Sequence, residues 1–387
     1  VYQGSSYVLV TESQPVHMFQ LTRRLTGGEL PTVYTVDLRQ ELQEGNRSIF
    51  SRKLQELMTD RLNKGQQTIL FLNRRGYAGF VSCRSCGEVM KCPHCDVSLS
   101  EHKGGRLICH YCGYTQPMPK LCPKCGSKYI LGFKAGTQQI EEKLKELYPG
   151  VRTLRMDADT TRTKDSYEKI LSSFANGEAD VLIGTQMIVK GHDFPKVTLV
   201  GILAADLSLN ASDYRAGERT FQLLTQAVGR AGRGALPGEA VIQTYQPDHY
   251  AITCAAAQDY ESFYQEEILY RELSGYPPVA HMLAVQIYGK EEENVKQLAL
   301  RLTDVVKSNM DFLSGKQKEQ SNKKIQVLGP APANISKIND IYRYVFYVKH
   351  AEYDVLVEVK DRLEETLRQW QPRQMSIQFD FDPVSVL

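Results

Sequence analysis

The sequence has no long apolar run and no marked net charge. Hydrophobic residues make up 42% and charged residues 24% of the 387 positions, close to the averages for soluble globular proteins. No stretch approaches the ~20 consecutive apolar residues that a membrane-spanning helix needs. The formal net charge is only +2, so any nucleic-acid-binding surface must be local. The chain also lacks an initiator Met and a basic, apolar signal peptide at its start. We expect a folded, soluble piece of a longer protein.

The order of apolar segments predicts an α/β domain with an insertion, followed by a second domain. At ~150 residues per domain, the length predicts two or three domains. Helical and buried-strand patterns alternate from residue 51 to residue 244, which is typical of a parallel sheet. Pro277-Pro278 marks a boundary, and the order β-α-β-β-α-β beyond it predicts a split-βαβ sandwich. The predicted ranges are 1–50 for the end of a larger unit, 51–82 and 130–273 for the α/β domain, 83–129 for the insertion and 274–387 for an α+β domain.

Eight of the nine cysteines form four C-x-x-C pairs between residues 83 and 125. Such a turn directs two thiolates at one point, and a glycine after it, as three of the pairs have, closes the turn with a positive φ. Two pairs satisfy one tetrahedral Zn²⁺, so four pairs predict two zinc ions. The 13-residue gap between the second and third pairs is close to zinc-ribbon spacing and favours a nested arrangement. The predicted ligands are Cys92, Cys95, Cys109 and Cys112 for an inner site and Cys83, Cys86, Cys122 and Cys125 for an outer site.

Other uses of the cysteines are less favoured. A disulfide framework needs a secreted chain, and a redox C-x-x-C needs one pair beside a thioredoxin-like unit. Eight thiolates already fill two sites, so His94, His102 and His110 are expected to face solvent or DNA. Because all ligand positions are filled by sulfur, we expect the zinc to be structural rather than catalytic.

The cysteine block is also locally basic. Residues 83–134 contain eight Lys or Arg against three Asp or Glu, together with Tyr111 and Tyr114. A positive surface with aromatic side chains suits phosphate contacts and base stacking, although a solvated charged face is the alternative. We interpret it as a DNA-contacting surface.

Three polar segments follow predicted strands or end a predicted helix. Residues 184–193 follow a buried strand, where parallel sheets build ligand sites. In residues 226–233, two arginines three positions apart stand between glycines at the end of a helix, which suits guanidinium contact with a phosphate. Arg74 and Arg75 lie just beyond another strand. A surface loop that binds a carboxylate is the alternative for the arginine pair.

These segments resemble motifs of a known enzyme class. Q-x-x-G-R-x-G-R at 226–233 is similar to motif VI, and residues 184–193 to motif V, of the second motor lobe of superfamily-two helicases. With the sequence Phe-Leu-Asn-Arg-Arg-Gly-Tyr at 71–77 leading into the cysteine pairs, their order resembles the PriA family of bacterial primosomal replication-restart helicases. The resemblance covers nearly the whole chain and is weaker in the first fifty residues. It implies a RecA-like second motor lobe with a two-zinc insertion. It makes 1–50 the end of the first motor lobe or a connector, and 274–387 a C-terminal domain that binds DNA and partner proteins.

The resemblance implies an ATP-dependent DNA helicase that moves 3′ to 5′, binds stalled or abandoned replication forks and restarts replication through primosome assembly. Its partners would be single-stranded and forked DNA, single-strand DNA-binding protein and the proteins that load the replicative helicase. It would be a monomer in the bacterial cytoplasm, associated with the nucleoid. It would use ATP and Mg²⁺.

The resemblance also implies residue roles. Arg230 and Arg233 would face the ATP γ-phosphate, with Arg233 as the arginine finger, and Gln226 would position the nucleotide or the attacking water. Gly191 and Asp193 would couple the nucleotide to DNA. The expected DNA contacts are Thr185, Arg74, Arg75 and Lys190.

The sequence departs from the family in one respect. It contains neither G-x-x-x-x-G-K-[ST] nor an Asp-Glu pair, so the phosphate cradle and the Mg²⁺ ligands of the first lobe are missing. We therefore expect these 387 residues alone not to hydrolyse ATP. Two alternatives remain: a non-catalytic, zinc-dependent nucleic-acid scaffold, and a subunit whose first lobe comes from another chain.

The strand predicted near 341–349 has two different faces. Tyr342, Tyr344, Phe346 and Val348 alternate with Arg343, Val345, Tyr347 and Lys349. The first set is expected in the core. Arg343, Tyr347 and Lys349 are a candidate exposed stripe for stacking single-stranded bases, or an ordinary solvated strand face.

Overall fold

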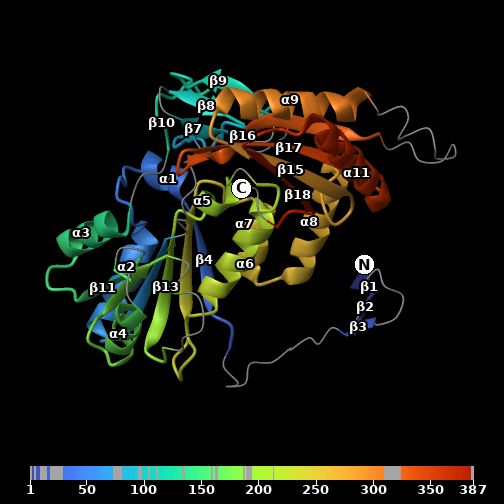
Figure 1. Cartoon of the computed structure of the whole chain (residues 1–387). Helices are drawn as coiled ribbons and strands as arrows, with labels where there is room; N and C mark the ends of the chain where they lie inside the picture. The colour runs from blue at the N-terminus through green and yellow to red at the C-terminus, as the bar shows by residue number, and fades with distance from the viewer. Residues whose placement is uncertain are drawn as a thin grey trace.

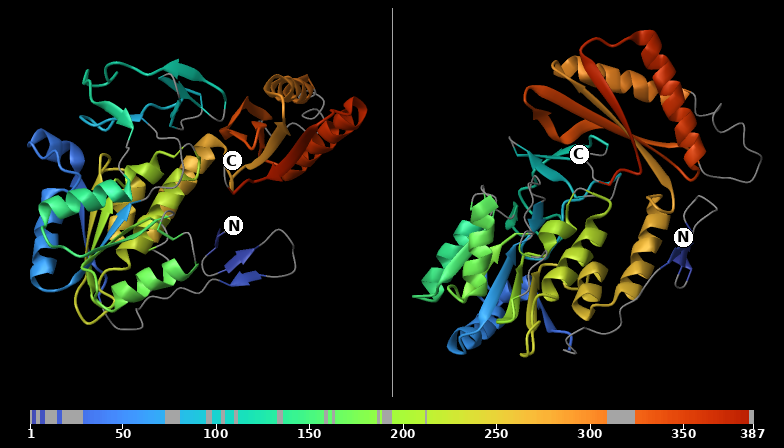
Figure 2. Two further views of the ribbon diagram at one scale, coloured as in Figure 1. Left: turned by 60° about the vertical axis from the view of Figure 1, so that its left-hand side comes forward. Right: turned by 60° about the horizontal axis from the view of Figure 1, so that its bottom comes forward.

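Three regions build the molecule, a computed structural model. A parallel-sheet lobe carries a cysteine-rich insertion and an α+β domain, which lie side by side over one end of the lobe (Figures 1 and 2). The structure describes residues 2–3, 6–8, 15–17, 29–72, 81–94, 98–102, 105–109, 112–132, 136–157, 160–161, 164–185, 188, 194–211, 213–308 and 324–384.

The lobe contains six parallel strands in the order β11-β12-β5-β13-β14-β4. The central strands β5, β12 and β13 are buried along their whole length, as expected where helices cover both faces of a parallel sheet. The alternation of strands and helices in the sequence predicted this sheet correctly. The strands are β4 (Thr32–Asp37), β5 (Gln67–Leu72), β11 (Thr153–Met156), β12 (Val181–Gly184), β13 (Val197–Leu203) and β14 (Glu239–Thr244).

The edge strand β4 was expected in the segment before the lobe. Instead it pairs with β14 along its whole length, from Thr32 beside Glu239 to Asp37 beside Thr244. Its alternating side chains explain this, because Val33 packs against one core of the lobe and Val36 against the other. The helix α1 (Leu38–Gln43) follows, and the strands β1 (Tyr2–Gln3), β2 (Ser6–Val8) and β3 (Pro15–His17) form a separate small sheet.

Helices cover both faces of the lobe sheet. On one face α2 packs Leu54 and Met58, and α3 packs Ile140 and Leu144, at the i, i+4 spacing of one helix side. The opposite face is covered by α4, α6 and α7, with Phe263 of α8 joining the same core. The bounds are α2 (Arg52–Asn63), α3 (Thr137–Leu147), α4 (Lys164–Ala175), the short α5 (Asp206–Leu209), α6 (Ala216–Val228), α7 (Tyr250–Ala257) and α8 (Tyr260–Ser274).

The second domain is the expected split-βαβ sandwich. Its antiparallel sheet has the order β16-β17-β15-β18, and α9 and α11 pack on one face over side chains such as Leu283, Val285 and Phe346 (Figure 2). The elements are β15 (His281–Gly289), α9 (Glu292–Ser308), β16 (Gln326–Ile338), β17 (Ile341–His350), α11 (Tyr353–Trp370) and β18 (Met375–Phe381).

The insertion enters and leaves the lobe at one place. Its first strand β6 pairs with its last strand β10, with Cys83 beside Ile130. The insertion therefore separates β5 from α3 in the sequence, while both elements still pack into the same core of the lobe. Between β6 and β10 lies a small antiparallel sheet of three strands. The elements are β6 (Val81–Cys83), β7 (Ser100–His102), β8 (Arg106–Ile108), β9 (Thr115–Pro117) and β10 (Ile130–Gly132).

The insertion covers the face of the second sheet that was a candidate base-stacking stripe. Leu99 and Leu107 of the insertion share a hydrophobic cluster with Met282 and Tyr347. Tyr347 is 1% exposed, and the buried Lys349 donates from Nζ to the carbonyl of Ser274 at 2.7 Å. The prediction of an exposed stripe at Tyr347 and Lys349 is therefore wrong, because another region buries that face. Arg343 is half-buried.

No helix in the described part of the chain is both long and apolar enough to span a membrane.

Candidate functional site: paired metal centres and a motor loop

The four cysteines of the predicted outer site come together in the structure. The thiol sulfurs of Cys83, Cys86, Cys122 and Cys125 all lie within 4.8 Å of one another. The Sγ atoms of Cys83 and Cys125 are 3.6 Å apart, as are those of Cys86 and Cys122. Tetrahedral zinc with Zn–S bonds of about 2.3 Å places its sulfurs about 3.8 Å apart. The group therefore fits a tetrahedral zinc ion.

The inner site shows the same arrangement in its described residues. The sulfurs of Cys92, Cys109 and Cys112 also lie within 4.8 Å of one another, with those of Cys92 and Cys112 at 3.5 Å. Cys95 lies outside the described residues and stays a prediction as the fourth ligand. The sulfurs thus group in the nested way that the spacing favoured.

The glycine after a C-x-x-C pair closes its turn. Three of the pairs share one pattern, in which the glycine N–H donates to the carbonyl of the first cysteine. These hydrogen bonds join Gly87 to Cys83 at 2.8 Å, Gly113 to Cys109 at 2.9 Å and Gly126 to Cys122 at 2.9 Å. The three glycines have φ values of +77°, +79° and +69°, a region that side chains with a Cβ rarely adopt. The glycine that follows each of these three cysteine pairs in the sequence is therefore required by the backbone conformation of the turn.

Two thiols of the outer site, Cys83 and Cys86, have pKa values shifted in opposite directions. Burial alone would raise the pKa of Cys83, but hydrogen bonds from the N–H groups of Cys86 and Ser85 and from the neighbouring thiols outweigh burial and lower this pKa to about 7. Burial and the neighbouring sulfurs raise the pKa of Cys86 to about 12, although the N–H of Glu88 opposes this. Four crowded thiolates repel one another, and a divalent cation provides the charge that lets all of them ionise.

Each metal site lies against a different neighbour. The knuckle of the outer site touches the lobe, because a Cβ on Gly87 would lie 2.6 Å from the carbonyl oxygen of Tyr245, just after β14. The inner knuckle touches the second domain, because a Cβ on Gly113 would lie 3.4 Å from the carbonyl oxygen of Pro330. The insertion therefore bridges the lobe and the second domain.

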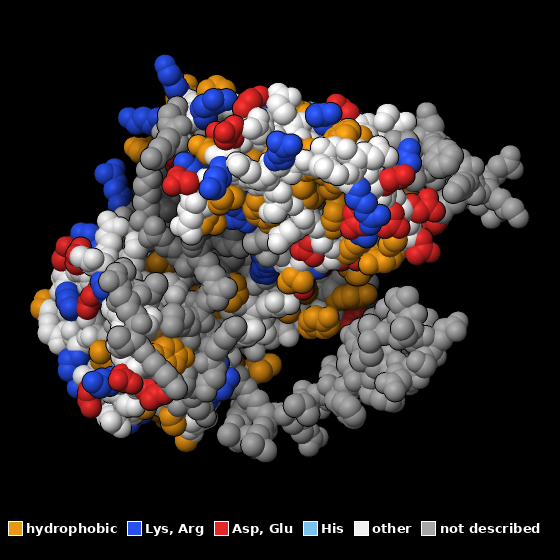
Figure 3. Space-filling model, in the orientation of Figure 1, with side chains coloured by type: hydrophobic (Ala, Val, Ile, Leu, Met, Phe, Trp, Pro, Cys, Tyr) orange, Lys and Arg blue, Asp and Glu red, His pale blue; other side chains and the backbone are white. Residues whose placement is uncertain are grey.

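The far side of the outer site is basic and partly aromatic. Lys120, Lys124 and Lys128 are exposed, and Figure 3 shows Lys and Arg side chains projecting over the insertion. The Nζ atom of Lys128 lies 5.9 Å from the ring centre of Tyr129, which is 50% exposed. Of the two tyrosines predicted to stack on bases, Tyr114 is half-buried with its ring against His94, and Tyr111 lies outside the described residues. Tyr129, flanked by lysine, was missed.

The predicted phosphate-binding arginines follow α6. Gln226 is exposed on the last turn of α6, and Arg230 and Arg233 are half-buried in the loop beyond it. The Nε atom of Arg233 donates to the carbonyl of Gly229 at 2.9 Å. Gly232 has a φ of +66°, and a Cβ on Gly232 or Gly234 would overlap backbone atoms of Gly238 or Pro195, respectively. The glycines therefore let this loop, residues 229–238, fold onto itself and onto residue 195, rather than only opening space for a phosphate.

Thr185 and the arginine loop lie at opposite edges of the sheet. Thr185 follows β12 at the carboxyl edge, where its N–H donates to the carbonyl of Met156 at 3.3 Å. Gly232 donates to the carbonyl of Val197, the first residue of β13, at the amino edge. The other predicted residues of this set, Arg74, Arg75, Lys190, Gly191 and Asp193, lie outside the described residues.

Three protein-family models match the chain. The primosomal protein N C-terminal domain matches residues 272–384, the PriA DNA helicase Cys-rich region matches residues 92–117, and the helicase conserved C-terminal domain matches residues 121–235. Replication restart protein PriA of Bacillus subtilis is 43% identical over 372 residues, which are 96% of this chain and 45% of that protein. The chain belongs to the PriA family. The family resemblance of the motifs is thus confirmed, as is the fold of a helicase C-terminal lobe with a cysteine-rich region.

Other PriA relatives match to a similar extent. The protein of Synechocystis is 41% identical over 375 residues, 96% of this chain and 43% of that protein. The protein of Haemophilus influenzae is 35% identical over 344 residues, 88% of this chain and 44% of that protein. The chain thus spans less than half the length of these PriA proteins.

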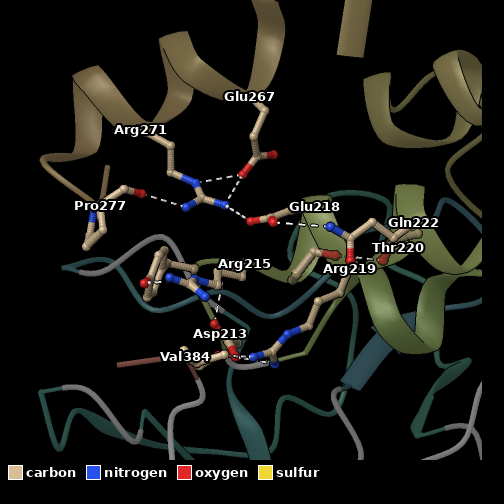
Figure 4. A network of polar contacts seen from close by, with 12 residues as sticks. Asp213, Arg215, Glu218, Arg219, Thr220, Gln222, Glu267, Arg271, Pro277 and Val384 are labelled. Atoms are coloured by element: carbon tan, nitrogen blue, oxygen red, sulfur yellow. Dashed lines mark hydrogen bonds and ion pairs between the residues drawn. The ribbon is translucent and has the colours of Figure 1, made fainter. Parts of the chain in front are cut away.

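A polar network at the start of α6 escaped the sequence analysis. Figure 4 shows the buried guanidinium of Arg271 pointing at Glu267, Glu218 and the carbonyl of Pro277, which it reaches at 2.7 Å. Nearby, Arg219 of α6 contacts Asp213 and the carbonyl of Val384, beyond β18. The helix that ends at the arginine loop therefore begins next to both ends of the second domain, through Arg271 at Pro277 and through Arg219 at Val384. The i, i+4 pair Glu267 and Arg271 is a common helix pattern, and it gave no signal of such contacts.

Proposed function

We propose that this chain supplies the second motor lobe, the zinc-binding insertion and the C-terminal domain of an ATP-dependent DNA helicase that restarts replication. The observation that carries the proposal is the arginine loop after α6, held at a fixed edge of a helicase-type lobe in a chain of the PriA family. By the family resemblance, the enzyme moves 3′ to 5′ and acts on stalled or abandoned forks.

In this proposal the loop is the nucleotide-sensing half of a divided ATP site. Arg233 is the arginine finger and Arg230 its neighbour on the γ-phosphate, where a guanidinium stabilises the charge of the transferring phosphoryl group. Gln226, exposed one turn earlier, orients the nucleotide or the attacking water. The phosphate cradle and the Mg²⁺ ligands come from a first lobe, consistent with relatives more than twice as long as this chain.

The opposite edge of the lobe holds the DNA. Thr185 contacts the phosphates of the tracking strand, and Arg74, Arg75 and Lys190 add charge-assisted contacts. Gly191 and Asp193 couple this edge to the nucleotide, since the segment that contains them leads to Pro195, which touches the arginine loop. On the insertion, the exposed lysines and Tyr129 suit contacts to phosphates and bases.

Two zinc ions stabilise the insertion and take no part in catalysis. Cys83, Cys86, Cys122 and Cys125 hold one, and Cys92, Cys95, Cys109 and Cys112 hold the other. Four thiolates complete a tetrahedral shell, which leaves no open position for chemistry. By the family resemblance, the protein works as a monomer with single-strand DNA-binding protein and primosome proteins.

The test compares the full-length protein with this chain. The full-length protein is expected to unwind a fork in an ATP-dependent reaction, whereas this chain should bind DNA without hydrolysing ATP. DNA-stimulated ATP turnover by this chain alone would contradict the divided site. A full-length protein that binds forks but neither hydrolyses ATP nor unwinds them would favour the alternative of a non-catalytic, zinc-dependent scaffold.

A further inference from the structure

A cavity of about 240 Å³ lies where the insertion meets the lobe. Lys91 and Ser98 line it from the insertion, and residues after β13 and β14, including Tyr214 and His249, line it from the lobe. These positions belong to the carboxyl edge of the sheet. In the strand order, β13 and β14 continue from β12 and β5, the strands that lead to Thr185 and to residues 74–75. The cavity thus continues the edge that the proposed function assigns to the DNA strand.

The walls of the cavity combine aromatic rings with amides. Tyr214, Tyr250 and Tyr270 line it together with His249, Asn210 and Gln246. The rings of His249 and Tyr250 stack at 4.5 Å. The Nε2 atom of Gln246 donates to Oδ1 of Asn210 at 3.4 Å, so the two amides form one polar edge. Tyr214 and Tyr250 already stack on Tyr276 and Phe263, so a planar heteroaromatic ring in the cavity would meet the edges of these rings and the hydrogen-bonding groups at the rim.

The charges around the cavity suit a ligand that carries a phosphate. Lys91 is exposed at its rim. The carboxylate of Asp213 is paired with Arg219 and accepts the N–H of Arg215 at 3.0 Å, so its charge is compensated. His249 is neutral near pH 7, because burial and then the charge of Lys91 lower its pKa to about 4. Its Nδ1 accepts the N–H of Ala251 at 3.2 Å, which leaves the proton on Nε2 as a donor.

The volume limits the ligand. Pockets for drug-sized molecules occupy roughly 300–1,000 Å³, more than this cavity offers. We propose that the cavity binds one unstacked base of single-stranded DNA, with Lys91 contacting the adjoining phosphate. This inference rests on the proposed function, since it requires that DNA follows the carboxyl edge.

The test uses this chain, loaded with zinc, and oligonucleotides of about 12 residues in which 2-aminopurine occupies one position after another. One position should show a fluorescence change, because its base leaves its neighbours in the strand and enters the cavity. Ala211→Phe, which fills the cavity, should abolish that change and leave the signals at other positions intact. Gln246→Ala and Lys91→Ala should weaken it, and the matched surface variant Lys307→Ala should not.

An abasic oligonucleotide provides a second measurement that does not depend on one variant folding. Removal of the base at the responding position should weaken binding to the unaltered chain about fivefold or more, should weaken binding to Gln246→Ala by a smaller factor, and should have no effect on binding to Ala211→Phe beyond the loss that this variant already shows. If DNA binds but no position responds to the cavity variants, the cavity proposal is wrong and the proposed function stands. If the chain binds no single-stranded DNA at all, the DNA-binding role itself fails.

Discussion

The two edges of the lobe sheet differ in what covers them. At the carboxyl edge lie Thr185, the base-sized cavity and the outer metal knuckle, where Gly87 touches Tyr245. At the amino edge the arginine loop folds tightly onto the start of β13. Helix α6 joins them, because it begins in the network around Arg271 and ends at Gly229. Under the proposed function, this difference predicts that DNA and nucleotide contacts are separable by mutation, with α6 as the physical connection between the two edges.

The largest expected effect comes from removing a buried ligand of the inner metal site, which touches the second domain rather than the lobe. Cys109→Ser should lower the zinc content from about two ions per chain to about one and release the second domain, because the inner knuckle touches Pro330. Zinc analysis and limited proteolysis near residues 274–281 measure both effects. Cys125→Ser, at an exposed ligand of the outer site, is the matched variant. It should lose as much zinc while the second domain stays protected, and equal protease sensitivity in both variants would contradict separate roles for the two sites.

The next largest effect concerns the connection through α6. Arg271→Ala leaves the buried carboxylate of Glu267 without its cationic partner, with the hydrogen bond from the hydroxyl of Tyr250 remaining, and breaking a buried pair in this way costs about 3–5 kcal/mol. The midpoint temperature of thermal unfolding of the lobe should therefore fall. Arg301→Ala removes only a contact to the ring of Trp370 at 4.2 Å and is expected to cost about 0.5–1 kcal/mol. Similar decreases in the unfolding temperature of both variants would argue against a stabilising contact between the lobe and the second domain through this network.

A smaller effect should depend on pH at the carboxyl edge. The folded pKa of His249, about 4, is below the value near 6.5 of an unfolded chain. Its contribution to stability is therefore present above pH 6.5 and lost as the pH falls toward 4. His249→Asn keeps a cap for α7 without the titration, so its free energy of unfolding should rise by about 1 kcal/mol relative to that of the unaltered chain as the pH falls from about 8 to about 5.5. A constant difference across this range, measured by thermal unfolding, would show that His249 does not titrate this way.

An effect of comparable size should separate DNA binding from hydrolysis. Thr185→Ala in the full-length protein should weaken single-stranded DNA binding by about 1–2 kcal/mol through the loss of one hydrogen bond to a phosphate. ATP turnover at saturating DNA should change little. Thr366→Ala, on an exposed turn of α11, is the control. A large loss of turnover with unchanged DNA affinity would move Thr185 out of the DNA-contacting set.

Some features were predictable because their cause is local. The spacing of the cysteines and the glycines after them determined how the described sulfurs group, since each turn closes within five residues. The parallel sheet followed from fully apolar strands such as Val181–Gly184. The sequence shows that glycines flank Arg230 and Arg233, but it does not show that these glycines also let the loop pack closely. The close contact of Gly234 with Pro195 joins positions that are distant in the sequence.

Other features depended on which regions pack together. The alternation in β17 predicted two faces correctly, but it does not reveal that the insertion covers Tyr347 or that Lys349 is buried against Ser274. The pairing of β4 with β14 and the contacts of Arg271 likewise join distant segments. In each case the local pattern fits two environments, and only the tertiary contact distinguishes them.

The most direct test of the divided motor is Arg233→Ala in the full-length protein, with ATP turnover and fork binding measured on the same sample. An arginine finger contributes about 10³-fold or more to turnover, so hydrolysis should fall by at least that factor while fork affinity stays within about twofold. Arg368→Ala, on the exposed side of α11, should leave both unchanged. Retained hydrolysis in Arg233→Ala, or a parallel loss of fork binding, would contradict the assignment of the amino edge to the nucleotide.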